Sequence, residues 1–142
     1  MLNGTLRLVT VQGDQKQFVA TSGAGHSLVL DTQGGNTGAR PVELALLATG
    51  ACTAMDVITI LRKKRQIVTG YEVELSAEQR EDYPQTFTKV TIKHKLRGKI
   101  DPAAVKRAIE LSETKYCSVG AMIAKSAKIE ATFEIVPDGS GV

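Results

Sequence analysis

Apolar and polar residues alternate in short runs over the first part of the chain. The alternation predicts strands over residues 5–11, 16–21 and 26–31. Gly13-Asp14 and Ser22-Gly23 separate these runs, and both pairs are residue types that favour tight turns. We therefore expect an antiparallel meander, followed by a glycine-rich loop over 32–40.

The longest apolar stretch of the sequence runs from residue 44 to residue 61. Pro41 suits the first helical position, Glu43 suits the first turn, and the basic run 62–65 suits a solvated helix end. These signals predict a helix over 41–65. Its middle is apolar almost all the way round, so it must be covered on every side. We infer that a partner subunit supplies part of this cover, most simply in a twofold homodimer.

The second half of the chain mixes strand and helix patterns. The elements expected there are strands over 71–75 and 89–96, with a charged loop or ragged strand end over 77–85 between them, helices over 101–114 and from 118, and a strand over 129–135. Asp101 and Pro102 suit the N-cap and the first position of the first of these helices. The length of 142 residues predicts a single domain over 1–142, with a disordered tail at 137–142.

Composition and charge exclude several functional classes. The chain is 42% hydrophobic and 23% charged, which is typical of a globular protein. Its 18 basic residues are interleaved with 15 acidic ones, so nucleic acid is not the expected partner. The amino terminus lacks the apolar stretch of a signal peptide, and Cys52, Thr53 and Asp56 make residues 44–61 a poor membrane span. We expect a cytoplasmic protein without a membrane segment.

The two cysteines are the candidates for chemistry. They form neither a disulfide framework nor a zinc-binding spacing, so they are either inert core residues or reactive thiols. Cys117 precedes a predicted helix, whose amino terminus favours a thiolate. Cys52 lies in the long helix and needs an outside group, for which Arg40 and Glu43 are candidates. Glu43 has a second explanation, the stabilisation of the first helical turn.

Metal ligands and cofactors are not expected from the sequence. His26 and His94 are isolated on predicted strands, where structural or surface roles are commoner than metal binding. An inert cysteine in an alanine-rich buried helix would also be ordinary.

Three segments carry a resemblance to a known family. RPVELALLA at 40–48, GACTAMDV at 50–57 and KYCSV at 115–119 resemble the OsmC family of osmotically inducible and organic hydroperoxide resistance proteins. The likeness extends over most of the chain, because the expected elements follow the order of that family. The sequence is more similar to the general OsmC-like branch than to the organic hydroperoxide resistance branch.

The resemblance implies an α+β fold with antiparallel strands wrapped around a long central helix. It also implies an intertwined homodimer with two active sites at the subunit interface. The implied activity is that of a thiol-dependent peroxidase, which reduces organic hydroperoxides or hydrogen peroxide in oxidative or osmotic stress defence. Cys52 would attack the peroxide and Cys117 would resolve the resulting sulfenic acid to a disulfide. An external dithiol, a lipoyl group in the hydroperoxide branch, would regenerate both thiols.

The resemblance also suggests which charged residues activate Cys52. Glu43 is the counterpart of the activating glutamate near the start of the long helix, and Arg40 is the available substitute for the family's catalytic arginine. Glu43 and Cys52 are about two and a half turns apart, so one straight helix points them to opposite faces. Glu43 can then assist only if the first turn is unwound, or if it serves the site across the dimer.

Two other functions remain open from the sequence. The first is a non-catalytic protein of the same fold that binds an apolar small molecule at the dimer interface. The second is a structural or partner-binding dimer whose thiols are buried and inert.

Overall fold

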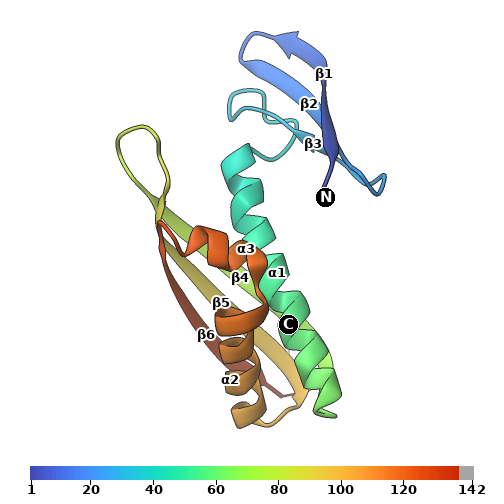
Figure 1. Ribbon diagram of the computed structural model, residues 1–142, viewed down its shortest axis with the longest axis vertical. Coiled ribbons are helices and arrows are strands. Elements are labelled where there is room, and N and C mark those ends of the chain that lie inside the picture. Colours follow the sequence, from blue (N-terminus) through green and yellow to red (C-terminus); the bar gives the residue numbers. More distant parts are fainter. Residues whose placement is uncertain (138–142) are drawn as a thin grey trace. The chain divides into compact units, whose positions relative to one another are not determined.

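The computed structural model describes residues 1–137 and consists of two compact units, Met1–Ala45 and the chain from Leu46 onward. Along the chain the elements are β1 (Gly4–Gln12), β2 (Gln15–Ser22), β3 (Ser27–Leu30), α1 (Pro41–Lys63), β4 (Ile67–Gln79), β5 (Phe87–Lys99), α2 (Pro102–Leu111), η1 (Ser112–Tyr116), α3 (Ser118–Ile123) and β6 (Lys128–Val136) (Figure 1). The single domain over 1–142 stays a prediction. The expected disorder at 137–142 falls almost entirely on residues outside the described part.

The first unit contains the antiparallel meander that the alternation predicts. β2 lies between β1 and β3 and pairs antiparallel with both. After β3 the chain turns through a loop that the buried Asp31 carboxylate holds in place. This carboxylate accepts hydrogen bonds from the hydroxyl and N–H of Thr37 and from the N–H groups of Lys16 and Thr32. These bonds, that of the Thr37 side chain first, lower the pKa of Asp31 to about 2 against the opposing effect of burial.

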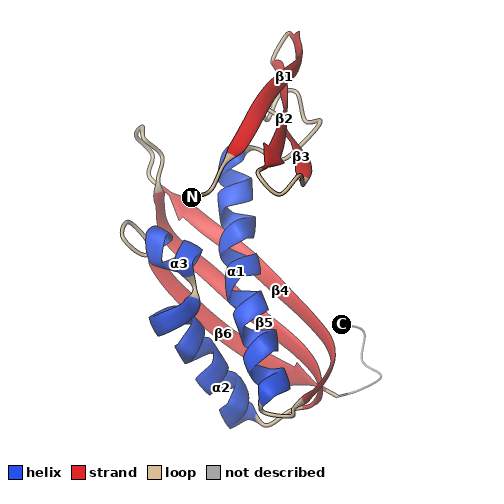
Figure 2. Ribbon diagram, turned by 45° about the vertical axis from the view of Figure 1, so that its right-hand side comes forward, coloured by secondary structure: helices blue, strands red, loops and turns tan. Residues whose placement is uncertain are grey.

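The second unit is a three-stranded sheet covered by helices on one face (Figure 2). β4 pairs antiparallel with β5, whereas β5 pairs parallel with β6. The parallel pair follows from the connection, because the chain returns through α2, η1 and α3 before it enters β6. The sheet is therefore mixed, where the resemblance implies antiparallel strands.

β4 and β5 are longer than the predicted strands, and of the segment 77–85, expected as a loop or a ragged strand end, residues 77–79 belong to β4. β4 continues to Gln79 and β5 begins at Phe87. Charged residues such as Glu78 and Lys89, paired in register, sit within the strands, because a sheet with one face open to solvent accommodates them. The expected strand end is therefore found at residues 77–79, and the expected loop lies beyond them.

The core of the second unit is aliphatic and centres on one stripe of α1. Residues at four-residue spacing, Thr49, Thr53, Val57 and Leu61, are buried, as expected for one face of a helix. The apolar core cluster consists of Val57, Leu61, Leu96, Ala104, Val105, Ala108 and Ile109. The α1 residues Leu47 and Met55 are 53% and 68% exposed. The second unit thus buries one side of α1 and leaves an apolar side exposed.

The carboxyl end of α1 explains why this helix is shorter than predicted. The helix ends at Lys63, because Arg65 adopts a left-handed backbone with φ of 58°. The N–H of Gln66 donates to the carbonyl of Leu61, and that of Arg65 donates to the carbonyl of Arg62, both at 3.0 Å. This pair of bonds is the Schellman termination. By length and composition α1 could also cross a membrane, a property that it shares with core helices of soluble proteins.

His94 is a buried structural residue of the sheet. Its side chain is fully buried, and its Nδ1 lies 2.6 Å from the hydroxyl of Tyr71. The other ring nitrogen, Nε2, has no hydrogen-bond partner among the described residues. Burial lowers the pKa of His94 from 6.5 to about 4, because the charged ring would be poorly solvated there.

This buried imidazole predicts a pH-dependent stability. The unfolded chain binds the His94 proton below a pH of 6.5, whereas the folded chain binds it only near 4. The contribution of the neutral His94 to the free energy of unfolding is therefore fully present above the unfolded pKa. It falls as the pH is lowered from about 6.5 to about 4. We expect this residue to account for a loss of about 2 kcal/mol between about pH 7 and about pH 4.5.

Urea unfolding at the two pH values measures the effect. His94→Gln should flatten the pH dependence, whereas His26→Gln, which changes an exposed histidine, should leave it as in the unmodified chain. Equal pH dependence in both variants would contradict the assignment to His94.

Candidate active site

Folding of the second unit brings Cys52 and Cys117 together. Cys52 lies on α1 and is half-buried, whereas Cys117 is 7% exposed; both are free thiols. The two sulfur atoms and a carboxylate oxygen of Asp56 all lie within 4.8 Å of one another. Two thiols and one carboxylate therefore share one partly buried site.

The geometry of α1 fixes two of these three side chains. Cys52 and Asp56 are four residues apart on one helix, so they lie on the same face one turn apart. Ser112, which is fully buried, donates to Asp56 Oδ2 at 2.9 Å, and its Oγ also lies 2.9 Å from Thr53 Oγ1. These contacts tie α1 to the end of α2 beside the cysteines.

An irregular turn places Cys117. The sequence predicts a helix to about residue 114, but α2 ends at Leu111 and the chain widens into the π-helical turn η1. The N–H of Cys117 donates to the carbonyl of Ser112 at 2.8 Å, across five residues. Such π-helical turns are rare in proteins overall, but a large share of them occur at functional sites. The wider turn brings the Cys117 backbone back over Ser112, next to α1.

Cys117 is also the N-cap residue of α3. Its sulfur accepts a hydrogen bond from the N–H of Gly120 at 3.2 Å. A Cβ atom at position 120 would lie 2.8 Å from this sulfur, so the glycine leaves the space that the thiol occupies.

The helix amino terminus favours the Cys117 thiolate as expected, because the Gly120 N–H lowers the pKa of the thiol, but other effects outweigh it. Burial raises the pKa of the Cys117 thiol to about 11, and a hydrogen bond with Cys52 adds to this effect. The Gly120 N–H acts in the opposite direction but is outweighed, because a buried thiolate loses more hydration than a single N–H restores. Cys117 is therefore a protonated thiol at neutral pH.

A small pocket adjoins Cys117 in the second unit. Its walls are mainly apolar and combine α1, the sheet and the segment around α3. The lining residues are Thr49, Thr53, Ile92, Glu113, Cys117, Gly120, Ala121, Ala124 and Ile129. Burial raises the pKa of Glu113, one of the lining residues.

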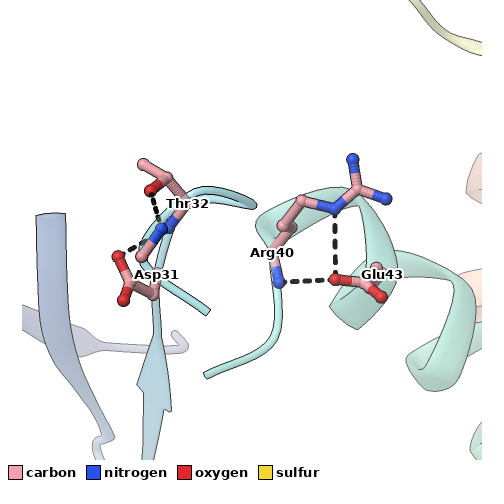
Figure 3. A network of polar contacts seen from close by, with 5 residues as sticks. Asp31, Thr32, Arg40 and Glu43 are labelled. Carbon is pink, nitrogen blue, oxygen red and sulfur yellow. Dashed lines mark hydrogen bonds and ion pairs between the residues drawn. The ribbon is translucent and has the colours of Figure 1, made fainter. Parts of the chain in front are cut away.

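Arg40 and Glu43 belong to the first unit, where they bond to each other (Figure 3). Glu43 Oε1 accepts from the Arg40 backbone N–H at 3.0 Å and from Arg40 Nε at 3.2 Å. The backbone bond, foremost, holds the pKa of Glu43 below its ordinary value. The carboxylate thus completes half of a capping box at the start of α1. The first turn is helical from Pro41, so the unwound turn that would redirect Glu43 is not observed.

The sequence reasoning missed Asp56 and Ser112 as site residues. A signal for Asp56 was present, because a carboxylate one turn after Cys52 in an apolar helix must share its face. Ser112 had no such signal, since the contact depends on where α2 ends. Arg40 and Glu43 stay predictions for this site.

These features define a class: a small α+β protein with a helix-covered sheet and a paired-thiol site. The chain belongs to the OsmC-like protein family, whose model matches residues 34–132. It is 40% identical over 120 residues to Protein YhfA of Escherichia coli strain K12, covering 84% of this chain and 90% of that protein. The family inferred from the three sequence segments is thereby confirmed.

Solved structures confirm the fold. A hypothetical protein from Aquifex aeolicus VF5 matches with a TM-score of 0.86 and 30% identity, over 97% of this chain and 98% of that one. An organic hydroperoxide resistance protein from Elizabethkingia anophelis matches with a TM-score of 0.67 and 13% identity, over 96% of each chain. At 13% identity, the similarity to the Elizabethkingia anophelis protein shows a shared fold and nothing more.

The contacts of Ser112 generate a prediction about stability. Ser112→Ala removes a buried donor to a carboxylate, which should lower the free energy of unfolding by about 1.5–3 kcal/mol. Ser126→Ala is the matched control, since Ser126 is exposed and its hydroxyl donates to the carbonyl of Ile123 at 3.4 Å. Urea unfolding of both variants measures the difference. Equal stability of the two would contradict a structural role for the Ser112 hydroxyl.

Proposed function

We propose that this protein is a thiol-dependent peroxidase that reduces organic hydroperoxides or hydrogen peroxide, with Cys52 as peroxidatic and Cys117 as resolving residue. The observation that carries the proposal is the approach of the two sulfur atoms to within 4.8 Å of each other. A disulfide requires the two sulfur atoms to approach to about 2.05 Å, and sulfur atoms that are already neighbours are the starting point for that step. The exposure of Cys52 exceeds that of Cys117, in keeping with Cys52 as the sulfur that meets the peroxide.

The proposed reaction has three balanced steps. The Cys52 thiolate attacks one peroxide oxygen and the O–O bond breaks, giving Cys52 sulfenic acid and, after protonation, an alcohol or water. The Cys117 sulfur then displaces hydroxide from the sulfenic acid, and the disulfide forms as water leaves. An external dithiol, such as a lipoyl protein, reduces this disulfide by exchange and is itself oxidised.

The protonation state of Cys117 suits the resolving role. With the pKa of its thiol raised to about 11, Cys117 is a poor nucleophile toward peroxide, since the thiolate is the attacking form. Asp56, close to both sulfurs, is placed to accept the proton that Cys117 loses as the disulfide forms.

The apolar pocket beside Cys117 supports the proposal that the substrate is an organic hydroperoxide. Ile92, Ala121 and Ile129 line it and could contact an alkyl or aryl group. The same pocket favours the second candidate function, a non-catalytic protein that binds an apolar small molecule. Turnover with a dithiol separates the two functions.

The exposed side of α1 supports a homodimer. Leu47, Ala51 and Met55 recur at four-residue spacing on this side and are exposed, and an apolar stripe of this kind favours a second copy of the chain as cover. In such a dimer we propose that Arg40 and Glu43 serve a thiol pair across the interface. Glu43 would orient the Arg40 guanidinium, which would stabilise the Cys52 thiolate.

The catalytic assignment predicts different defects for the two cysteines. Cys52→Ser should lower dithiol-dependent hydroperoxide consumption by at least about a hundredfold, because it removes the nucleophile. Cys117→Ser should also lose turnover but should still react once with peroxide, leaving a sulfenic acid. A dimedone adduct on Cys52, detected by mass spectrometry, measures that single reaction.

Full turnover by Cys52→Ser would overturn the assignment. Absence of turnover with several dithiols, together with a retained apolar ligand, would favour the binding function. If neither cysteine reacts with iodoacetamide before unfolding, the thiols are inert and the protein is a structural dimer.

The dimer proposal predicts that a charge on the exposed side of α1 separates the subunits. Met55→Glu should shift the molar mass in light scattering from dimer to monomer, because a buried carboxylate would be desolvated in the interface. Met55→Leu keeps the apolar surface and should remain dimeric. A dimeric Met55→Glu protein, or a monomeric unmodified chain, would contradict this interface.

A further inference from the structure

The side chains of Cys52, Asp56 and Cys117 surround a common point. One ligand atom from each lies within 4.8 Å of the other two. Tetrahedral zinc, with Zn–S bonds of about 2.3 Å and Zn–O bonds of about 2.0–2.2 Å, holds such atoms roughly 3.5–3.8 Å apart. Rotation of the side chains spans the difference. We propose that the reduced protein binds one divalent ion of the zinc class through these three residues.

The chemistry of the donors selects the ion. Two thiolates and one carboxylate suit Zn²⁺ or Cd²⁺, whereas Mg²⁺ and Ca²⁺ require sites made of oxygen ligands. Three protein ligands leave the fourth tetrahedral position for water, as in open zinc sites. The sequence shows no zinc-binding spacing between the cysteines, because Cys117 joins Cys52 and Asp56 only through folding.

The surroundings of Asp56 fit a metal ligand. A ligating carboxylate is commonly oriented by an outer hydrogen bond, and Ser112 supplies one at 2.9 Å to Asp56 Oδ2. Ser112 is itself fully buried and in contact with Thr53. The carboxylate thus has a fixed support, and Asp56 lies one helical turn from Cys52.

Binding and oxidation exclude each other at this site. The ion replaces the two thiol protons, so that one M²⁺ and two thiols give one dithiolate complex and two H⁺. A disulfide offers no thiolate, and a bound ion occupies both sulfurs. The site would therefore hold the ion only in the reduced protein, and the bound ion would shield both cysteines from electrophiles.

Titration of the reduced, chelator-treated protein with Co²⁺ tests the proposal. We expect a thiolate-to-cobalt charge-transfer band and tetrahedral d–d bands that saturate at one ion per chain, and loss of both on addition of Zn²⁺. Cys52→Ser and Cys117→Ser should each weaken binding by at least about a hundredfold, and Asp56→Asn by at least about tenfold. Asp82→Asn, at an exposed residue of the β4–β5 loop, should bind as the unmodified chain does.

A second measurement needs no variant. One equivalent of Zn²⁺ should slow iodoacetamide alkylation of both cysteines in the unmodified protein by at least about tenfold. Absence of the charge-transfer band, unchanged binding by Asp56→Asn, or unchanged alkylation with Zn²⁺ would each overturn the inference. Neither measurement uses peroxide, so an inactive protein that binds the ion would contradict only the peroxidase proposal, and an active protein that does not bind it only this inference.

Discussion

The packing of one stripe of α1 against the sheet and α2 is the constraint on which the site depends. Thr53, Val57 and Leu61 are buried at four-residue spacing, and this orientation fixes the rotation of the helix about its axis. Once that rotation is set, Cys52 and Asp56 must lie at the edge of the buried stripe. The packing of the aliphatic core therefore sets the direction in which the Cys52 and Asp56 side chains point.

The connection from α2 to α3 supplies the second half of the site. A regular helix continued beyond Leu111 would carry the chain past α1, whereas the π-helical turn returns it over Ser112. Cys117 then becomes at once the cap of α3 and the neighbour of Cys52. Two environments compete at its sulfur, and burial outweighs the helix cap, so the pKa is raised. A short irregular segment thus decides both the position of the thiol and its protonation.

The same three side chains support two chemistries that both begin from the reduced thiols and exclude each other. Peroxide reduction oxidises the dithiol to a disulfide, whereas metal binding keeps it as a dithiolate. The carboxylate of Asp56 is common to both, as a proton acceptor in one and a ligand in the other. Peroxide and metal ion would then compete for the reduced protein at one shared site, and once the disulfide has formed the site would accept neither.

The sequence by itself determined the elements and their boundaries wherever local signals act. Asp101 caps α2 through the N–H of Ala103, as its residue type predicts, and Pro41 begins α1. The alternation located every strand, although β4 and β5 are longer than predicted. The segments around the two cysteines also identified the family. These features are local, because capping and period depend on neighbours in the chain.

Tertiary structure decided what local signals cannot encode. The parallel pairing of β5 with β6, the π-helical turn before Cys117 and the contact of Ser112 with Asp56 each join residues that are distant in the sequence. The raised pKa of Cys117 is also decided by the tertiary structure, because the burial of a side chain depends on all the residues packed around it. The sequence therefore supplied the reactive groups, and only the packing of α1, α2 and the sheet determined which of them meet.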